Sequence, residues 1–272
     1  MKELINDITA QLSACYPEDE ARTLAWWILE ESTGLSRSQL LCDCKGTKNI
    51  SNLQIIIDRL LHFEPIQYIF GHTLWNGLDL KVTPATLIPR PETAELVEKI
   101  SNINFQISNC RVLDIGTGSG CIAIALKKAH PEWQVTGMDI SPQAIEVARE
   151  NAARNKVEVT FLETDVFSDF NEDFDIIVSN PPYICESEKE SMRRNVLDYE
   201  PASALFVPDH DPLRFYRRIV ERFAHAPKYL FFEINEAFGE PLRALMEQKG
   251  YTDIVITKDI YGKPRIIEGR MA

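Results

Sequence analysis

Apolar residues recur at helical spacing through the first 64 residues of the chain. The first such stripe consists of Leu4, Ile5, Ile8 and Leu12. Pro17 interrupts it, and the acidic run at 18–20 favours a new helix start. With two later apolar runs, the pattern predicts four short helices packed as a small bundle over residues 1–64. Recognition of a partner and a purely structural role are both open for this bundle.

The next segment, residues 65–90, is punctuated by proline and glycine. Within it Leu78, Leu80 and Val82 alternate with polar positions, which is typical of a strand with one buried face. This segment is predicted to be a β-hairpin that links two domains.

From residue 91 to 272, short apolar runs alternate with helical patterns. The runs that predict strands are 111–115, 135–138, 157–162, 175–179 and 229–234. Two further strands, 253–257 and 265–268, turn back on each other around Gly262. Strands alternating with helices and ending in a hairpin predict an α/β domain with a mostly parallel sheet and one antiparallel strand.

Three glycines at alternate positions follow the predicted strand at 111–115. The loop reads Gly116, Thr117, Gly118, Ser119 and Gly120. Glycine permits a tight turn and lets the backbone approach a ligand closely. The spacing G-x-G-x-G differs from the dinucleotide-binding G-x-G-x-x-G, and many nucleotide-binding folds share such loops. Asp114 just before the loop either braces it or lies near the amino group of a zwitterionic ligand.

Carboxylates end the next two predicted strands. Asp139 stands 19 residues beyond Gly120, a position suited to a ribose diol. Asp165 can accept a hydrogen bond from an adenine amino group, while Val166 or Phe167 covers the ring. Because the carboxyl ends of parallel strands share one edge of a sheet, these residues predict a nucleotide-type ligand there.

A fourth strand end carries the motif Asn180, Pro181, Pro182 and Tyr183 after a buried β-branched run. The two prolines make a rigid, non-helical elbow. The Asn180 amide oxygen and the Pro181 carbonyl can accept both protons of a planar –NH2 group, and the Tyr183 ring can stack on it. An ordinary strand-ending turn is the alternative, since Asn-Pro and Pro-Pro both mark turns.

Two polar segments have open roles. One is a cluster of polar residues at a predicted helix start: Arg90, Glu92, Thr93 and Glu95. These residues either belong to a functional site or form a helix cap with a surface ion pair. The stretch from 184 to 208, which contains Glu200 and Pro201, is long for a connection, as lids and binding loops often are.

Composition narrows the class of protein. The net charge of −12 over 272 residues argues against nucleic acid as the main partner, and Arg214, Arg217 and Arg218 are expected on a solvated helix face. No apolar run is long enough to predict a membrane span.

The cysteines are scattered: Cys15, Cys42, Cys44, Cys110, Cys121 and Cys185. The histidines form no ligand pattern: His62, His72, His130, His210 and His225. Reduced cytoplasmic thiols and no metal are therefore expected.

Taken together, the motifs resemble those of class I S-adenosylmethionine-dependent methyltransferases. Within them the chain is similar to the HemK/PrmC family, protein-(glutamine-N5) methyltransferases that modify peptide-chain release factors. The resemblance covers the whole chain and is carried by the helical N-terminal segment and by four motifs. These are Leu87-Ile-Pro-Arg-Pro-Glu-Thr, Asp114-Ile-Gly-Thr-Gly-Ser-Gly, Asn180-Pro-Pro-Tyr-Ile and Glu200-Pro201. The motif that begins at Leu87 is the most specific of the four.

This resemblance implies a Rossmann-like sheet and methyl transfer from S-adenosylmethionine to the glutamine amide of the release factors' Gly-Gly-Gln loop. The implied cofactor-binding residues are Gly116, Thr117, Gly118, Ser119, Gly120, Asp139, Val166 and Asn180. The implied substrate-binding residues are Asn180, Pro181, Pro182 and Tyr183, with Asn180, Pro181 and Tyr183 as the catalytic group. Neither a membrane nor direct nucleic-acid binding is required.

Three alternatives stay open from the residues. An amine methyltransferase acting on RNA or DNA would share the elbow, although the acidic balance opposes it. An NAD-dependent oxidoreductase is disfavoured by the glycine spacing. A non-catalytic binding module would leave the elbow unexplained.

Overall fold

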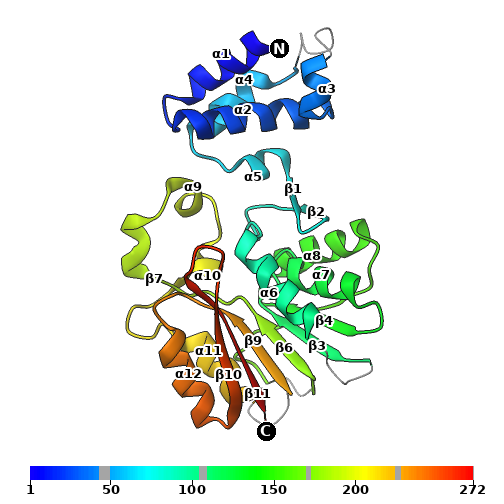
Figure 1. Cartoon of the computed structure of the whole chain (residues 1–272), viewed down its shortest axis with the longest axis vertical. Coiled ribbons are helices and arrows are strands. Elements are labelled where there is room, and N and C mark those ends of the chain that lie inside the picture. Colours follow the sequence, from blue (N-terminus) through cyan, green and yellow to red (C-terminus); the bar gives the residue numbers. More distant parts are fainter. Residues whose placement is uncertain (43–49, 104–108, 170–172, 224–227, 272) are drawn as a thin grey trace. The chain divides into compact units, whose positions relative to one another are not determined.

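The computed structural model describes residues 1–42, 50–103, 109–169, 173–223 and 228–271, and it divides into two compact units (Figure 1). The smaller unit comprises residues 1–71 and 193–199, and the larger unit comprises the remainder. The roles predicted for 1–64, 65–90 and 91–272 stay predictions. Cys44 and His225 lie outside the described residues.

The smaller unit is helical. Its helices are α1 (Lys2–Leu12), α2 (Glu18–Thr33), α3 (Arg37–Cys42), α4 (Leu53–Leu61), α5 (Ile66–Phe70) and α9 (Arg194–Leu197). Acidic residues fill the first turn of α2, where they interact favourably with the positive end of the helix dipole. Gly34 ends the helix with φ of 67°. Ile8, Ile28 and Ile57 are fully buried between α1, α2 and α4. The four predicted helices are thus present, and α5 is an addition.

Residues 193–199 return to the smaller unit from far along the chain. The Arg194 guanidinium lies 4.7 Å from the centre of the Phe63 ring, a cation–π distance. The Tyr199 hydroxyl donates to the His62 carbonyl at 2.9 Å. Part of the long polar stretch is therefore a packed element of the smaller unit.

The larger unit contains a seven-stranded sheet in the order β10-β11-β9-β6-β3-β4-β5. Its strands are β3 (Arg111–Ile115), β4 (Gln134–Asp139), β5 (Thr160–Glu163), β6 (Ile176–Ser179), β9 (Tyr229–Glu233), β10 (Tyr251–Lys258) and β11 (Pro264–Met271). Among the described strands of this sheet, β11 runs antiparallel to both of its neighbours, and the other six strands point in one direction. The predicted fold class is confirmed.

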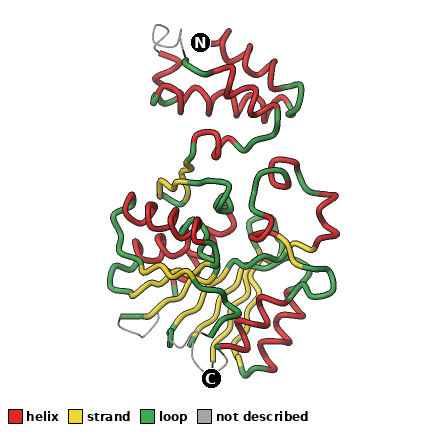
Figure 2. Tube along the Cα trace, turned by 180° about the vertical axis from the view of Figure 1, so that it is seen from behind, coloured by secondary structure: helices red, strands yellow, loops and turns green. Residues whose placement is uncertain are grey.

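Helices cover both faces of this sheet (Figures 1 and 2). One face carries α6 (Pro91–Asn102), α7 (Cys121–Ala129) and α8 (Pro142–Arg154), and the other carries α11 (Arg214–Arg222) and α12 (Gly239–Gln248). Each layer has its own apolar core, because strands buried on both faces present side chains to both sides. Shorter elements lie along the connection between β6 and α11: β7 (Ile184–Cys185), a 3-10 turn η1 (Glu186–Ser191), α10 (Ala202–Leu205) and β8 (Phe206–Val207).

The predicted hairpin is formed by β1 (His72–Trp75) and β2 (Leu78–Lys81) and packs within the larger unit. Asn76 and Gly77 make its two-residue turn with φ of 47° and 72°, the left-handed conformation that such turns need. The Asn151 side chain of α8 accepts from the Lys81 N–H at 2.6 Å and donates to the Lys81 carbonyl at 2.9 Å. The Trp75 indole donates to the Arg90 carbonyl at 2.7 Å, so the hairpin supports the segment that leads into α6.

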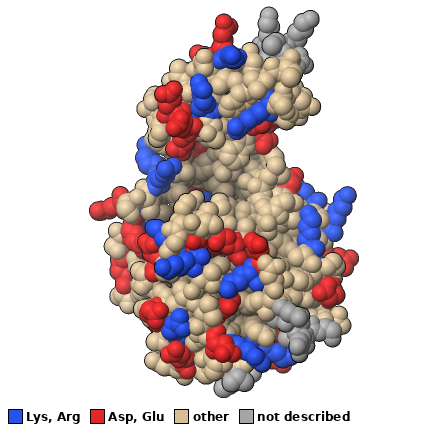
Figure 3. Space-filling view, viewed as in Figure 1, with Lys and Arg blue, Asp and Glu red and all other residues tan. Residues whose placement is uncertain are grey.

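Charges of both signs are interspersed on the face of the larger unit seen in Figure 3. The five cysteines of the described ranges are free thiols. In those ranges no group of three or more His, Cys, Asp or Glu residues is arranged to hold a metal ion. None of the described helices is long and apolar enough to cross a membrane.

Candidate active site

A cavity of about 510 Å³ opens at the carboxyl ends of β3, β4 and β6 in the larger unit. This is the edge at which parallel α/β sheets bind ligands. Its walls combine segments that are far apart in sequence. The lining residues used below are Arg90, Thr93, Gly116, Thr117, Gly118, Ser119, Asp139, Asp165, Val166, Phe167, Asn180, Pro181 and Pro182. Gly120 and Tyr183, which the resemblance implied as site residues, do not line it.

The glycine loop forms one wall. Gly116 and Gly118 have φ of 72° and 54°, a conformation that glycine adopts without strain. A β-carbon built on Gly116 would meet no atom within 4 Å, so the backbone is open to a ligand. Gly120 has another reason to be glycine: a β-carbon there would lie 3.0 Å from Ile124 and 3.1 Å from Ala148, where α7 packs on α8.

Asp114 braces this loop from below. One carboxylate oxygen accepts from the Thr117 hydroxyl at 2.6 Å and from the Ala123 N–H at 3.2 Å. The other oxygen is buried without a partner in the described part of the chain. Burial raises the Asp114 pKa to about 7, because desolvation outweighs those two hydrogen bonds. Its contacts match the bracing alternative.

Asp139 joins the loop to the end of β4. One of its oxygens accepts from the Gly118 N–H at 2.9 Å and the other accepts from the Ser141 N–H at 2.9 Å. Each oxygen keeps a lone pair for a further donor, such as a ribose hydroxyl. Burial raises its pKa, and the backbone N–H groups oppose that shift.

Val166 and Phe167 both line the cavity. The Arg218 guanidinium donates to the Val166 carbonyl at 2.9 Å and to the Phe167 carbonyl at 3.0 Å, which fixes the backbone of this turn. The Asp165 carboxylate accepts from the Phe167 N–H at 2.9 Å. Which of the two apolar side chains covers an adenine ring stays a prediction.

The elbow forms another part of the wall. The Ser179 hydroxyl donates to the Ile115 carbonyl at 2.7 Å, so the ends of β6 and β3 are tied together. The Asn180 amide nitrogen lies 3.4 Å from the Thr93 hydroxyl oxygen. Tyr183 does not line the cavity, and its hydroxyl donates to Glu233 at 3.0 Å.

In the polar cluster before α6, Arg90 is neither a side-chain cap nor part of a fully exposed ion pair. Arg90 precedes the helix without a capping side-chain bond, and its guanidinium donates to Glu200 at 2.6 Å. The Glu200 side chain is 1% exposed, and its second oxygen accepts from the Ile88 N–H at 3.2 Å. Glu200 thereby fixes the segment that walls the cavity beside Asn180.

Glu233 and Gly137 were absent from the sequence predictions. Glu233 ends the apolar strand β9, the same signal that identified Asp139. Gly137 lies within β4, where a β-carbon would lie 2.7 Å from the Thr117 hydroxyl oxygen and 2.8 Å from Phe161. Its signal is a glycine inside a strand, which often marks a close approach of another segment.

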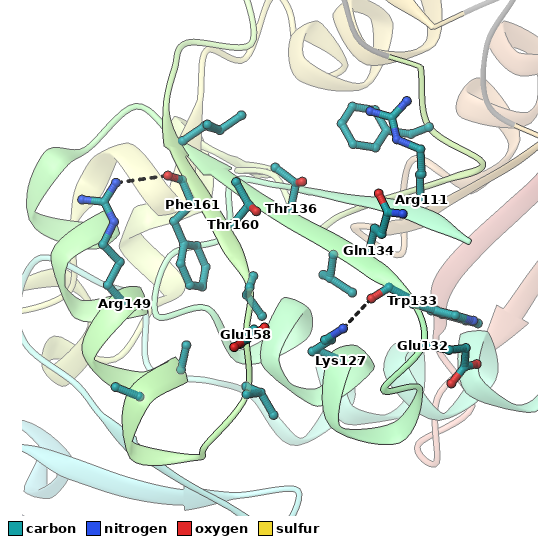
Figure 4. A pocket seen from close by; sticks show the side chains of 17 residues that line it. Arg111, Lys127, Glu132, Trp133, Gln134, Thr136, Arg149, Glu158, Thr160 and Phe161 are labelled. Atoms are coloured by element: carbon teal, nitrogen blue, oxygen red, sulfur yellow. Dashed lines mark hydrogen bonds between the residues drawn. The ribbon is translucent and has the colours of Figure 1, made fainter. Parts of the chain in front are cut away.

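A second groove, of about 700 Å³, lies at the start of β3, β4 and β5 (Figure 4). Two of its basic side chains already hold backbone carbonyls: Arg149 donates to Phe161 at 3.1 Å and Lys127 donates to Trp133 at 2.7 Å. Since ligands of parallel sheets bind at the opposite edge, the first cavity is the candidate active site.

Two family models match the chain. The Methyltransferase small domain matches residues 92–198, and the PrmC N-terminal domain matches residues 3–71. The fold and the site therefore define a methyltransferase of the Rossmann-like α/β class, with a family-specific helical unit before it.

Relatives in bacteria narrow this class. The chain is 45% identical to the release factor glutamine methyltransferase of Bacteroides thetaiotaomicron, over 97% of this chain and 99% of that protein. It is 44% identical to the one from Flavobacterium psychrophilum, over 94% of each chain. The chain belongs to the release factor glutamine methyltransferase family, as its motifs predicted.

Solved structures agree on the fold. The hMettl16 catalytic domain in complex with MAT2A 3'UTR hairpin 1 matches with a TM-score of 0.56 at 13% identity, over 84% of this chain and 94% of that one. A methyltransferase from Pyrococcus furiosus matches with a TM-score of 0.53 at 18% identity, over 78% and 96%.

Proposed function

We propose that this protein transfers a methyl group from S-adenosylmethionine to the side-chain amide nitrogen (N5) of the glutamine in the Gly-Gly-Gln motif of peptide-chain release factors. The observation that carries the proposal is the placement of Asn180 in one cavity with an open glycine loop. Family membership supports it.

The residues at the donor wall fit S-adenosylmethionine. The open backbone at Gly116 and Gly118 leaves room for the amino-acid part, and Asp139 retains acceptor capacity for the ribose. Val166 or Phe167 covers the adenine. The donor supplies a sulfonium methyl that is already activated, so orientation is the main task left to the protein.

The elbow is proposed to bind the methyl acceptor, the glutamine side-chain amide. An amide nitrogen is a poor nucleophile because its lone pair is delocalised into the carbonyl. The Asn180 amide oxygen and the Pro181 carbonyl accept its two protons and direct the lone pair toward the methyl group. As the bond from nitrogen to the methyl carbon forms, the bond from that carbon to the sulfonium sulfur would break, and the neutral thioether would leave. The nitrogen becomes much more acidic and releases one proton to solvent, so a positioned strong base is not required. Tyr183 does not line the cavity, so its proposed role is to support the elbow from behind the wall.

The helical unit is proposed to recognise the body of the release factor. The reaction is assigned to the cytoplasm, where release factors act, without direct binding of nucleic acid or a membrane.

Mass spectrometry of a release factor after incubation with the protein and S-adenosylmethionine tests the proposal. We expect a gain of one methyl group on the Gly-Gly-Gln glutamine, lost about 100-fold or more in Asn180→Ala because the amide is no longer oriented. Calorimetry should show S-adenosylmethionine binding retained in that variant. Methylation of RNA or DNA in place of the release factor would contradict the proposed substrate.

A further inference from the structure

A buried carboxylate lies behind the elbow and has no role in the function proposed above. Glu233 is the last residue of β9 and is 1% exposed. An ionised group in such a position is costly unless several donors satisfy it. The identity of these donors indicates its use.

Three hydroxyl groups converge on Glu233. The Thr93 hydroxyl donates to one carboxylate oxygen at 2.7 Å, and the Tyr183 hydroxyl donates to the other at 3.0 Å. The Tyr216 hydroxyl donates to the Glu233 backbone carbonyl at 2.8 Å, which anchors the strand end. In both bonds the hydroxyl is the donor, so the single protons of Thr93 and Tyr183 are both committed to Glu233.

This commitment determines what Thr93 offers to Asn180. A threonine hydroxyl has one proton and two lone pairs, and its proton already points to Glu233. Toward Asn180 it can therefore only accept, which selects the –NH2 end of the Asn180 amide at 3.4 Å. The Asn180 amide oxygen then faces the cavity as an acceptor.

We propose that Glu233 is a positioning residue that acts through Thr93 to set the direction of the Asn180 amide. The inference rests on the proposed function, because an acceptor at Asn180 is needed when the substrate group is an –NH2 donor. Thr93 is 2% exposed and lines the cavity, so this chain runs directly from the buried carboxylate to the cavity wall. If the Asn180 amide were reversed, its –NH2 group would face the –NH2 group of the substrate amide. Both groups are donors, so they would repel each other.

Thr93→Val is the sharpest test, because valine has nearly the same shape but neither donates nor accepts. We expect kcat for methylation of the release factor to fall between about tenfold and a hundredfold. The Kd of S-adenosylmethionine should change less than about threefold, because most of its proposed contacts lie on the glycine loop and at Asp139. Thr93→Ser keeps the hydroxyl and should recover most of the lost turnover.

Glu233→Gln tests the carboxylate itself. Glutamine can donate to Thr93, and the Thr93 proton can then turn toward Asn180, so kcat should fall as in Thr93→Val. Because both residues act on Asn180 in series, the double variant should lose no more turnover than the worse single variant. Thr73→Val, at a buried threonine of β1 that does not line the cavity, is the matched control and should keep wild-type turnover.

The outcomes separate the two proposals. A wild-type protein that leaves the release-factor glutamine unmethylated overturns the proposed function. If the wild type methylates it but Thr93→Val retains full turnover, or if the losses in the double variant multiply, the role of Glu233 is overturned while the proposed function stands. Thermal unfolding of each variant identifies folded samples, and Thr93→Val decides alone if Glu233→Gln does not fold.

Discussion

At the scale of single residues, the site depends on carboxylates that hold backbone N–H groups. Asp139 holds Gly118 and Ser141 in this way, and Asp114 holds Ala123. Such bonds keep the glycine loop in shape before a ligand arrives, which lowers the entropy lost on binding. These two residues should therefore affect ligand affinity and stability more than the chemical step.

Asp139→Asn should weaken S-adenosylmethionine binding between about tenfold and a hundredfold, because hydrogen bonds to a charged group are lost. Isothermal titration calorimetry measures the change. Asp259→Asn is the matched control: Asp259 also accepts two backbone N–H bonds in a turn, from Tyr261 and Lys263, but does not line the cavity. Equal affinity in wild type and Asp139→Asn would remove Asp139 from the ligand site.

Asp114 should make stability depend on pH. Its folded pKa of about 7 lies above the value of about 3.9 in an unfolded chain, so the folded state binds more protons between these values. The stability that this group contributes is fully present below about pH 4 and is lost as the pH rises through about 7.

Urea unfolding at about pH 5 and about pH 8 should show a larger loss of unfolding free energy in the wild type than in Asp114→Asn, which does not titrate. A pH dependence that the substitution leaves unchanged would refute the raised pKa.

Most residues of the cavity were predictable because they follow apolar strands: Asp139, Val166 and Asn180 each stand at such an end. Glu233 also does, inside the stretch 229–234 that was predicted as one strand. Its pairing with Thr93 spans 140 positions of the chain, which no local pattern encodes.

At the scale of elements, long periodic segments were predictable and short ones were not. β5 begins at Thr160, three positions later than predicted, because its pairing with β4 starts there. Apolar alternation at Val157 and Val159 continues outside the ladder, where both side chains pack on the core. The five-residue α5 and four-residue α9 are too short to show a helical period.

The segment before α6 provides a test at this scale. Glu200→Gln should lower stability by about 2–4 kcal/mol, since Arg90 loses a nearly buried counter-charge. Tm should fall by roughly 5–10 °C in a protein of this size. The control Glu20→Gln removes the partner of Arg193 from an exposed ion pair and should cost less than about 1 kcal/mol. Similar Tm values for both variants would count against Glu200 as the anchor of this segment.

At the scale of the whole molecule, one chain builds two compact units of different architecture. The sequence separated a helical part from an α/β part because their hydrophobic periods differ. It did not reveal that residues 193–199 belong with the helices, because that assignment rests on contacts of Arg194 and Tyr199 with residues more than 100 positions away.

If the helical unit recognises the body of the release factor, a short Gly-Gly-Gln peptide should be a poor substrate. We expect its KM to exceed that of the intact release factor at least about tenfold, equivalent to about 1.4 kcal/mol of lost binding. The kcat should change less, because the elbow meets the same glutamine. Steady-state kinetics with both substrates decide, and matching KM values would leave the helical unit without this role.

The hydrogen bond from the Ser179 hydroxyl ties β6 to β3 and thereby bears on the spacing between the glycine loop and the elbow. The glycine loop and the elbow grow from these two neighbouring strands, whose separation of about 4.8 Å is a constant of backbone pairing. Backbone pairing therefore sets the distance between the proposed donor and acceptor of the methyl group. Side chains around the rim can diverge between organisms while the span between donor and acceptor stays the same.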